Sequence, residues 1–411
     1  MSNRSVSWLT MENEMAQVTL QSAQKSQGKA VAKETTRIFF LDYLRAALVI
    51  LVVLHHVALV YGAGAPFYYV EPPLTDPLAY LVLLVFILFN QAWFMGALFL
   101  IAGYFTPGSY ERKGSGSFLK SRMLRLGIPL LIWIFVISPL SSIGYWYIPA
   151  EFTGISEPLT WQAYPFLIGL GVAWFLALLL IFSFGYAAWR EPTKNETTSV
   201  HESQPPSYLG IGLFILALAL ASYLVRIIIP MGKEMLDFPT LSYLPQYLGF
   251  FIAGIIASRR NWMRTLPGSM GVAGFVAAIV ASLILFPLAA SGTMFSLQFS
   301  EPASWVGNGT WQSAVYALWD SLFAVGMTMA AITFFRRFFN EKSKFGAFLS
   351  QQSYAVYIIH VPIIVFVAIA LGQIIDLAPL PKFAVMSAII VPTCFVVAYI
   401  LRKIPGVSKV L

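Results

Sequence analysis

Charged residues are scarce in this chain, and their scarcity excludes an ordinary soluble protein. Of 411 residues only 11% are charged, against about 25% in typical soluble domains. Hydrophobic residues make up 58% of the chain and aromatic residues 15%. A soluble protein of this length needs far more charge to cover its core. The composition therefore indicates a protein that lies in a membrane.

Cysteine and histidine are also rare, which limits the chemistry of any active site. The one cysteine, Cys394, excludes an intramolecular disulfide and a cysteine metal cluster. Of the four histidines, His201 lies in a polar segment, and the adjacent pair His55 and His56 has a poor spacing for zinc. No GxSxG motif of a serine nucleophile occurs. We expect no metal site and no bound cofactor.

The N-terminal segment has no apolar core of the kind that marks a signal peptide. We interpret residues 1–36 as a disordered tail and the polar stretch 190–207 as a loop. A short tail follows at 404–411. No internal repeat is found, so the expected organisation is a single membrane domain over 37–403.

Hydrophobic runs of about 20 residues recur along the chain, the length that a helix needs to cross ~30 Å of hydrocarbon. The sequence predicts an all-α, polytopic membrane protein with about ten transmembrane helices. The predicted runs are 39–61, 78–104, 126–148, 167–189, 208–229, 242–258, 269–290, 314–335, 347–371 and 383–402.

The placement of basic residues predicts the orientation of these helices. If the N-terminus is cytoplasmic, 22 of the 26 Lys and Arg residues fall in cytoplasmic segments, and the outer loops hold only Lys233 and Lys382. This asymmetry follows the positive-inside rule, so we expect both termini in the cytoplasm of a protein of the cytoplasmic (inner) membrane. The net charge of +8 reflects this topology. We expect membrane lipids, and no nucleic acid, as partners.

The first predicted helix carries a polar stripe. Arg45 and His56 are eleven residues apart, 20° beyond three full turns at ~100° per residue, so they share a face. Asp42 lies three residues before Arg45 and can pair with it, whereas His55 is turned ~80° from Arg45. Ionisable groups within a membrane are costly and usually functional. A structural alternative remains open, in which Asp42 and Arg45 pair at the helix end and His56 bonds between helices.

Three further features bear on a functional site. Arg122 and Arg125 share a helical face at the cytoplasmic mouth of the third run, an arrangement suited to binding phosphate; equally, basic residues are common at cytoplasmic ends. His360 lies at a depth comparable with that of His56. The two histidines either face each other or line successive parts of one cavity. Asp320 is one of two carboxylates within the predicted hydrophobic runs. It either orients His56, holds an acceptor hydroxyl, or forms a hydrogen bond between helices.

The sequence resembles the membrane acyltransferase 3 family in four ordered motifs. "FLDYLRAALVILVVLHH" is similar to the first-helix signature of that family, an arginine followed by a histidine. The stretches "GYFTPGSYERKG" with "FLKSRMLRLGIPLL", "AWFLALLL" and "SYAVYIIHVPIIV" resemble the subgroup that includes the periplasmic-glucan succinyltransferases. The resemblance covers about residues 37–402. We expect no fused extracytoplasmic domain of the kind that some members carry.

The resemblance implies ten core helices and a cytoplasmic acyl-CoA co-substrate that modifies an acceptor, often a glycan, across the membrane. It implies that His56 is the catalytic histidine and Arg45 its partner, that Arg122 and Arg125 bind the CoA phosphates, and that His360 belongs to the site. From the residues alone, a histidine serves as base for a hydroxyl or as acyl carrier. The main alternative is a transporter or flippase with an intramembrane Arg/His path.

Overall fold

The structure is a computed structural model that describes residues 38–62, 67–72, 76–193, 204–291, 304–372 and 374–411. The expected tail at 1–36 and residues 194–203 of the expected loop lie outside the described residues. Within the described ranges the chain forms helices and loops, and its only β pairing is an isolated bridge between Met235 and Phe238. The all-α prediction is therefore confirmed.

Ten helical segments in the described part of the chain are long and apolar enough to cross a membrane, which confirms the predicted number. They are α2 (Phe39–Val60), α3 and α4 (Pro77–Lys113), α5 to η3 (Ser115–Tyr147), η4 to α10 (Trp161–Arg190), α11 (Tyr208–Ile228), η7 and α12 (Leu241–Arg259), α14 (Gly268–Ala290), α15 (Trp311–Phe338), α16 (Lys344–Gly372) and α17 (Pro379–Arg402). Several extend beyond the predicted runs, because polar residues continue the helices past the apolar core.

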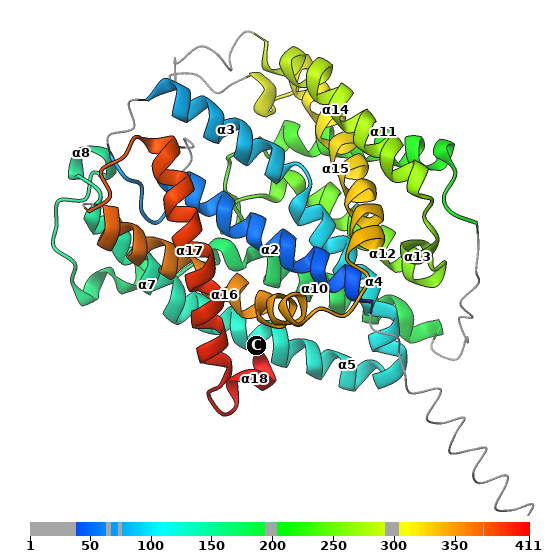
Figure 1. Cartoon of the computed structure of the whole chain (residues 1–411), viewed down its shortest axis with the longest axis horizontal. Helices are drawn as coiled ribbons and strands as arrows, with labels where there is room; N and C mark the ends of the chain where they lie inside the picture. Colours follow the sequence, from blue (N-terminus) through cyan, green and yellow to red (C-terminus); the bar gives the residue numbers. More distant parts are fainter. Residues whose placement is uncertain (1–37, 63–66, 73–75, 194–203, 292–303, 373) are drawn as a thin grey trace, which may run out of the picture. The chain divides into compact units, whose positions relative to one another are not determined.

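The ten membrane-spanning segments differ in how much of their most apolar stretch is buried. In α2 and α16, 67% of the most apolar stretch is buried, against 22% in α11 and α14. Figure 1 shows α2 in the middle of the view with other helices on both sides of it. On α11 the exposed residues recur every three or four positions, which gives one lipid-facing stripe: Leu209, Leu213, Leu216, Leu220 and Leu224.

Small residues let pairs of helices approach closely. A Cβ added to Gly103 of α4 (Phe94–Lys113) would lie 2.1 Å from the Phe251 carbonyl oxygen of α12 (Leu244–Arg259). In return, a Cβ on Gly254 would lie 2.1 Å from the Leu100 carbonyl oxygen. Lipid tails are as apolar as leucine, so membrane helices associate largely through such close packing. These glycines fix α12 against α4.

Two prolines widen the third span and release backbone carbonyls. Turns of π-helix at η1 (Met123–Gly127) and η2 (Trp133–Ile137) precede Pro129 and Pro139. A proline has no N–H to offer the carbonyl four residues earlier. Those carbonyls belong to Arg125 and Phe135, and each accepts a tyrosine hydroxyl instead, from Tyr354 and, at 2.7 Å, from Tyr164. These bonds satisfy the two carbonyls that the prolines leave without a helical donor.

Candidate active site

The helices α2 and α16 run parallel and contact each other at two polar levels. At one level the Arg45 guanidinium donates to the hydroxyl of Ser350 at 3.4 Å and to its carbonyl at 3.5 Å. At the other, the imidazole rings of His56 and His360 lie with their centroids 4.9 Å apart. The two polar residues of α2 are eleven positions apart, and those of α16 are ten positions apart. The polar residues of the two helices therefore meet at both levels.

The two histidines therefore face each other, the first of the two arrangements that the sequence left open. Nδ1 of His56 lies 3.1 Å from Nε2 of His360. Each Nδ1 also lies against a backbone carbonyl of its own helix, at 2.8 Å from Val52 for His56 and at 2.7 Å from Tyr357 for His360. A carbonyl only accepts hydrogen bonds, so each neutral ring carries its proton on Nδ1.

This assignment determines the free nitrogen of the pair. His360 presents the lone pair of Nε2 to the Nδ1 proton of His56, which is shared with the Val52 carbonyl. Nε2 of His56 keeps a lone pair that no contact within the pair uses. The arrangement has the logic of a catalytic dyad, in which one group holds the base in the required tautomer and supports its charged form.

The neighbouring His55 makes no hydrogen bond to this pair, but its ring lies edge-on to that of His56, with the centroids 5.3 Å apart. Its ring stacks on Phe94 with centroids 5.2 Å apart, and its side chain is buried. The His56 ring also packs against Phe67, at 5.4 Å between centroids. Phe67 belongs to the short loop segment 67–72 that follows α2.

The pairing expected between Asp42 and Arg45 is present. Their closest side-chain atoms lie 3.3 Å apart, and the Arg45 side chain is 39% exposed. Arg45 is thus held between Asp42 on its own helix and Ser350 on α16 while still open on one side. It lies eleven residues, ~16 Å, before His56 along α2.

The two arginines of the third span differ in environment. Arg122, the last residue of α5 (Ser115–Arg122), donates to Thr106 at 3.2 Å and lies over the Phe118 ring at 5.0 Å. Arg125 is exposed in the following π turn. Its carbonyl accepts the hydroxyl of Tyr354, one helical turn beyond Ser350 on α16. The structure thereby connects Arg125 to the same helix that contacts Arg45.

Asp320 bonds between helices, one of the three arrangements that the sequence left open. Its carboxylate accepts from Arg226 of α11 at 2.5 Å and from Ser321 at 3.3 Å. Both charged side chains are at most 1% exposed. The rings of Tyr243 and Tyr316 face the guanidinium at 4.7 and 5.4 Å. Both carboxylate oxygens are thus engaged within this cluster, and its position does not support the role expected for Asp320 beside His56.

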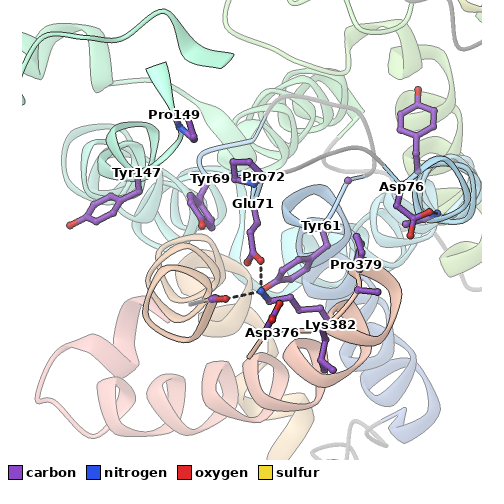
Figure 2. Close-up of a pocket in the computed structure, with 16 residues that line it drawn as sticks. Tyr61, Tyr69, Glu71, Pro72, Asp76, Tyr147, Pro149, Asp376, Pro379 and Lys382 are labelled. Atoms are coloured by element: carbon purple, nitrogen blue, oxygen red, sulfur yellow. Dashed lines mark hydrogen bonds and ion pairs between the residues drawn. The ribbon is translucent and has the colours of Figure 1, made fainter. Parts of the chain in front are cut away.

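A cavity of about 790 Å³ lies at the end of α2 (Figure 2), and sequence reasoning missed it. Its polar wall contains Tyr61, Tyr69, Glu71, Asp376 and Lys382. Lys382 forms an ion pair with Glu71, 311 residues away in sequence. One signal was available, because Lys382 is one of only two basic residues outside the predicted cytoplasmic segments and helices. We name this space the α2-end cavity.

Among the residues that the structure describes, no three His, Cys, Asp or Glu side chains gather closely enough to hold a metal ion.

Comparison with known proteins yields one family. The profile described as "Acyltransferase domain" (acyltransferase 3) matches residues 38–399, most of the chain. The matched range includes α2 and α16 with both histidines of the pair.

Similar proteins include three named "Glucans biosynthesis protein C", from Escherichia coli O81 (strain ED1a), Escherichia coli O17:K52:H18 (strain UMN026 / ExPEC) and Shigella dysenteriae serotype 1 (strain Sd197). Each is 24% identical over 350 residues, which cover 80% of this chain and 83% of the relative. No solved structure matches.

Proposed function

The chain belongs to the acyltransferase 3 family and is an acyltransferase, and from this premise we propose that it acylates a glycan hydroxyl across a membrane. The donor is cytoplasmic acyl-CoA carrying an acetyl or succinyl group, and the acceptor is extracytoplasmic. A glycan acceptor is supported by the similar proteins named for glucan biosynthesis. The sequence left a transporter or flippase open as an alternative function, and the family match does not support it.

The observation that carries the proposal is the free Nε2 of His56 in the histidine pair. Transfer of an acyl group from a thioester to an alcohol requires a base that takes the hydroxyl proton as the oxygen attacks. His56 has the lone pair for this step. His360 accepts from the opposite nitrogen of His56 and supports the positive charge that the ring acquires.

The proposed reaction is balanced within the site. The acceptor oxygen forms a bond to the thioester carbonyl carbon while its proton moves to Nε2 of His56. The tetrahedral intermediate then collapses, the carbon–sulfur bond breaks, and the proton passes to the departing sulfur as free CoA. An acyl-histidine route uses the same nitrogen as nucleophile, and acid quenching of a single turnover distinguishes the two by trapping, or failing to trap, acyl-protein.

Arg125 and Arg122 are proposed to bind the phosphates of the donor. Arg125 is exposed at the start of the third span, where a guanidinium can form paired bonds to phosphate. Arg122 lies beside it with its Nε buried and without a hydrogen bond. Arg45 is proposed to contact the donor between the arginines and the histidine pair. No bound cofactor is proposed, since acyl-CoA arrives as a co-substrate.

The depth of His56 supports transfer across the membrane. His56 is four residues, ~6 Å, from the end of α2, and seventeen residues, ~25 Å, from its start. With both termini in the cytoplasm, the histidine lies nearer the outer surface. The pantetheine arm then carries the acyl group from the arginines to His56 while the nucleotide stays inside. The Lys and Arg distribution supports this orientation and a location in the cytoplasmic membrane.

Purified protein, incubated with radiolabelled acetyl- and succinyl-CoA and extracted envelope glycans, tests the reaction. We expect release of free CoA that depends on the glycan, and label in the glycan. Glycan-independent CoA release of equal rate in wild type and in His56→Ala would contradict the proposal.

Sidedness has its own test. In inside-out vesicles, acyl-CoA added outside should label glycan trapped in the lumen. Label confined to glycan that was added on the same side as the CoA would overturn transfer across the membrane, and would leave the acyltransferase reaction itself intact.

A further inference from the structure

The α2-end cavity is built onto the helix that carries His56. Tyr61, in its wall, follows His56 by five residues, ~7.5 Å along the axis. The backbone N–H of Glu71 donates to the Val60 carbonyl at 2.9 Å, which fixes the loop segment 67–72 on the end of α2. Phe67 at the start of that segment packs on the His56 ring. One short segment thus contacts the histidine at one end and lines the cavity at the other.

Two buried polar atoms in the cavity wall have no hydrogen-bond partner: the hydroxyl of Tyr61, a residue only 3% exposed, and Oε2 of Glu71. A buried polar group without a hydrogen bond destabilises the fold. Their chemistry is complementary, because a phenol donates and a carboxylate accepts. An alcohol, which does both, satisfies the two together.

Lys382 holds the Glu71 carboxylate in place through one oxygen. The other oxygen has no hydrogen-bond partner. Lys382 binds Oε1 of Glu71 and donates to the Gly372 carbonyl at 2.7 Å. A Cβ on Gly372 would lie 2.8 Å from Oε2. Glycine at this position therefore leaves room beside the second oxygen. Figure 2 shows Tyr61, Glu71, Asp376 and Lys382 close together at the centre of the site.

The cavity offers donors and aromatic faces as well as acceptors. Burial, together with Glu71 and Tyr69, raises the pKa of Tyr61. Burial and Glu71 raise the pKa of Tyr69 to about 12. Both phenols therefore keep their protons near neutral pH. Rings with a few convergent polar groups, in a volume of about 300–1,000 Å³, are typical of small-molecule sites.

Charge in the cavity is unbalanced towards the negative. Three carboxylates, of Glu71, Asp76 and Asp376, line it together with one ammonium, that of Lys382. Asp76 caps the helix α3 (Pro77–Gln91) by accepting from two of its N–H groups, so its carboxylate remains fixed at the wall. Such a field repels phosphate, sulfate and uronate groups.

We propose that the α2-end cavity binds the acceptor, that it takes an uncharged, polyhydroxylated sugar unit through Tyr61 and Glu71, and that it rejects anionic sugars. This inference rests on the proposed function for the identity of the reacting hydroxyl, but binding by the cavity is measured independently of transfer.

Binding is measured on the full chain in lipid nanodiscs, by calorimetric titration with cellotetraose and maltotetraose and with the same chains ending in glucuronic acid. We expect a neutral chain to bind at least tenfold more tightly than its anionic counterpart. Tyr61→Phe, which removes only the unpartnered hydroxyl, should weaken neutral binding about tenfold. Tyr208→Phe, at an exposed position on α11, is the matched control and should bind as wild type does.

Asp376→Asn tests the charge preference with an exposed residue whose substitution leaves the fold intact. We expect it to reduce the discrimination against the anionic chain several-fold while neutral binding changes little. Equal binding of neutral and anionic chains by wild type, binding unaffected by Tyr61→Phe, or no binding of either neutral chain would each overturn the proposal.

Turnover assays separate this proposal from the proposed function. If acyl transfer occurs and the Tyr61→Phe variant raises the acceptor KM without changing the acyl-CoA KM, both stand. Saccharide binding without any transfer by wild type would refute the proposed function alone. Transfer with an acceptor KM that is insensitive to Tyr61→Phe and Glu71→Gln would refute the cavity alone.

Discussion

Two of the polar pairs between described helices, Arg226–Asp320 and His56–His360, differ in what they leave available. Arg226 and Asp320 form a buried ion pair in which both carboxylate oxygens are engaged. Two tyrosine rings lie against the guanidinium, whose Nε and second terminal nitrogen are buried without a hydrogen bond. His56 and His360 are neutral partners in which Nε2 of His56 keeps its lone pair. The ion pair has the form of a cross-link between α11 and α15, and the histidine pair has the form of a base and its support.

The contrast shows that intramembrane charge is an incomplete guide to function. Removing one partner of a buried ion pair leaves an uncompensated charge, so such a pair persists once it exists whether or not it takes part in a reaction. A neutral histidine loses less free energy of stabilisation when its partner is removed. Histidine also exchanges protons near neutral pH. The tests that follow are ordered by the expected effect on turnover, and their main substitutions are at His56, His360, Arg125 and Asp320.

The largest effect is expected from His56→Ala. Loss of a general base typically lowers the rate by about 10²–10⁴-fold, and kcat for acyl transfer should fall by this factor in protein that is folded and inserted. The control is His55→Leu, which replaces a ring stacked on Phe94 outside the pair and should retain most activity. Full activity of His56→Ala would remove the distinction between the two pairs.

His360 should give a smaller loss that depends on the replacement. His360→Leu removes the acceptor for the Nδ1 proton of His56, and a hydrogen bond to a charged group contributes about 1.5–3 kcal/mol, or roughly 10- to 100-fold in kcat. His360→Gln restores an acceptor oxygen and should recover part of that loss. Equal rates for the two variants would show that His360 acts only through packing.

Arg125→Gln should act on donor binding and leave the chemical step unchanged. We expect the KM for acyl-CoA to rise by roughly tenfold, the equivalent of ~1.4 kcal/mol, with the acceptor KM and kcat nearly unchanged. Arg122→Gln adds to this effect if both arginines bind phosphate. If the double variant binds CoA as tightly as wild type does, the two arginines do not bind the donor and serve only to determine topology.

The smallest effect on turnover is expected at the ion pair. Asp320→Asn breaks a buried pair and should destabilise the fold by about 3–5 kcal/mol, seen as a lower Tm in detergent, while kcat per folded molecule is unchanged. Replacing both partners, as Arg226→Met with Asp320→Leu, should recover much of the lost Tm. If kcat of folded Asp320→Asn falls as much as kcat of His360→Leu, Asp320 takes part in catalysis.

The sequence by itself determined whatever depends on one helix alone. The number of spans follows from the length of each apolar run, and the common face of Arg45 and His56 follows from a rotation of ~100° per residue. The Asp42–Arg45 pair was predicted for the same reason, since residues three apart in a helix are neighbours. These properties are local, and packing did not change them.

Only the tertiary structure decided which helices meet. His56 and His360 are 304 residues apart, Arg226 and Asp320 are 94 apart, and Glu71 and Lys382 are 311 apart. Whether Asp320 pairs with Arg226 or with a histidine depends on which faces the helices present to each other, and close glycine contacts between α4 and α12 and between α14 and α15 help to fix those faces. Helix geometry is set by each segment, whereas the partner of a buried polar group is set by the packing of all of them.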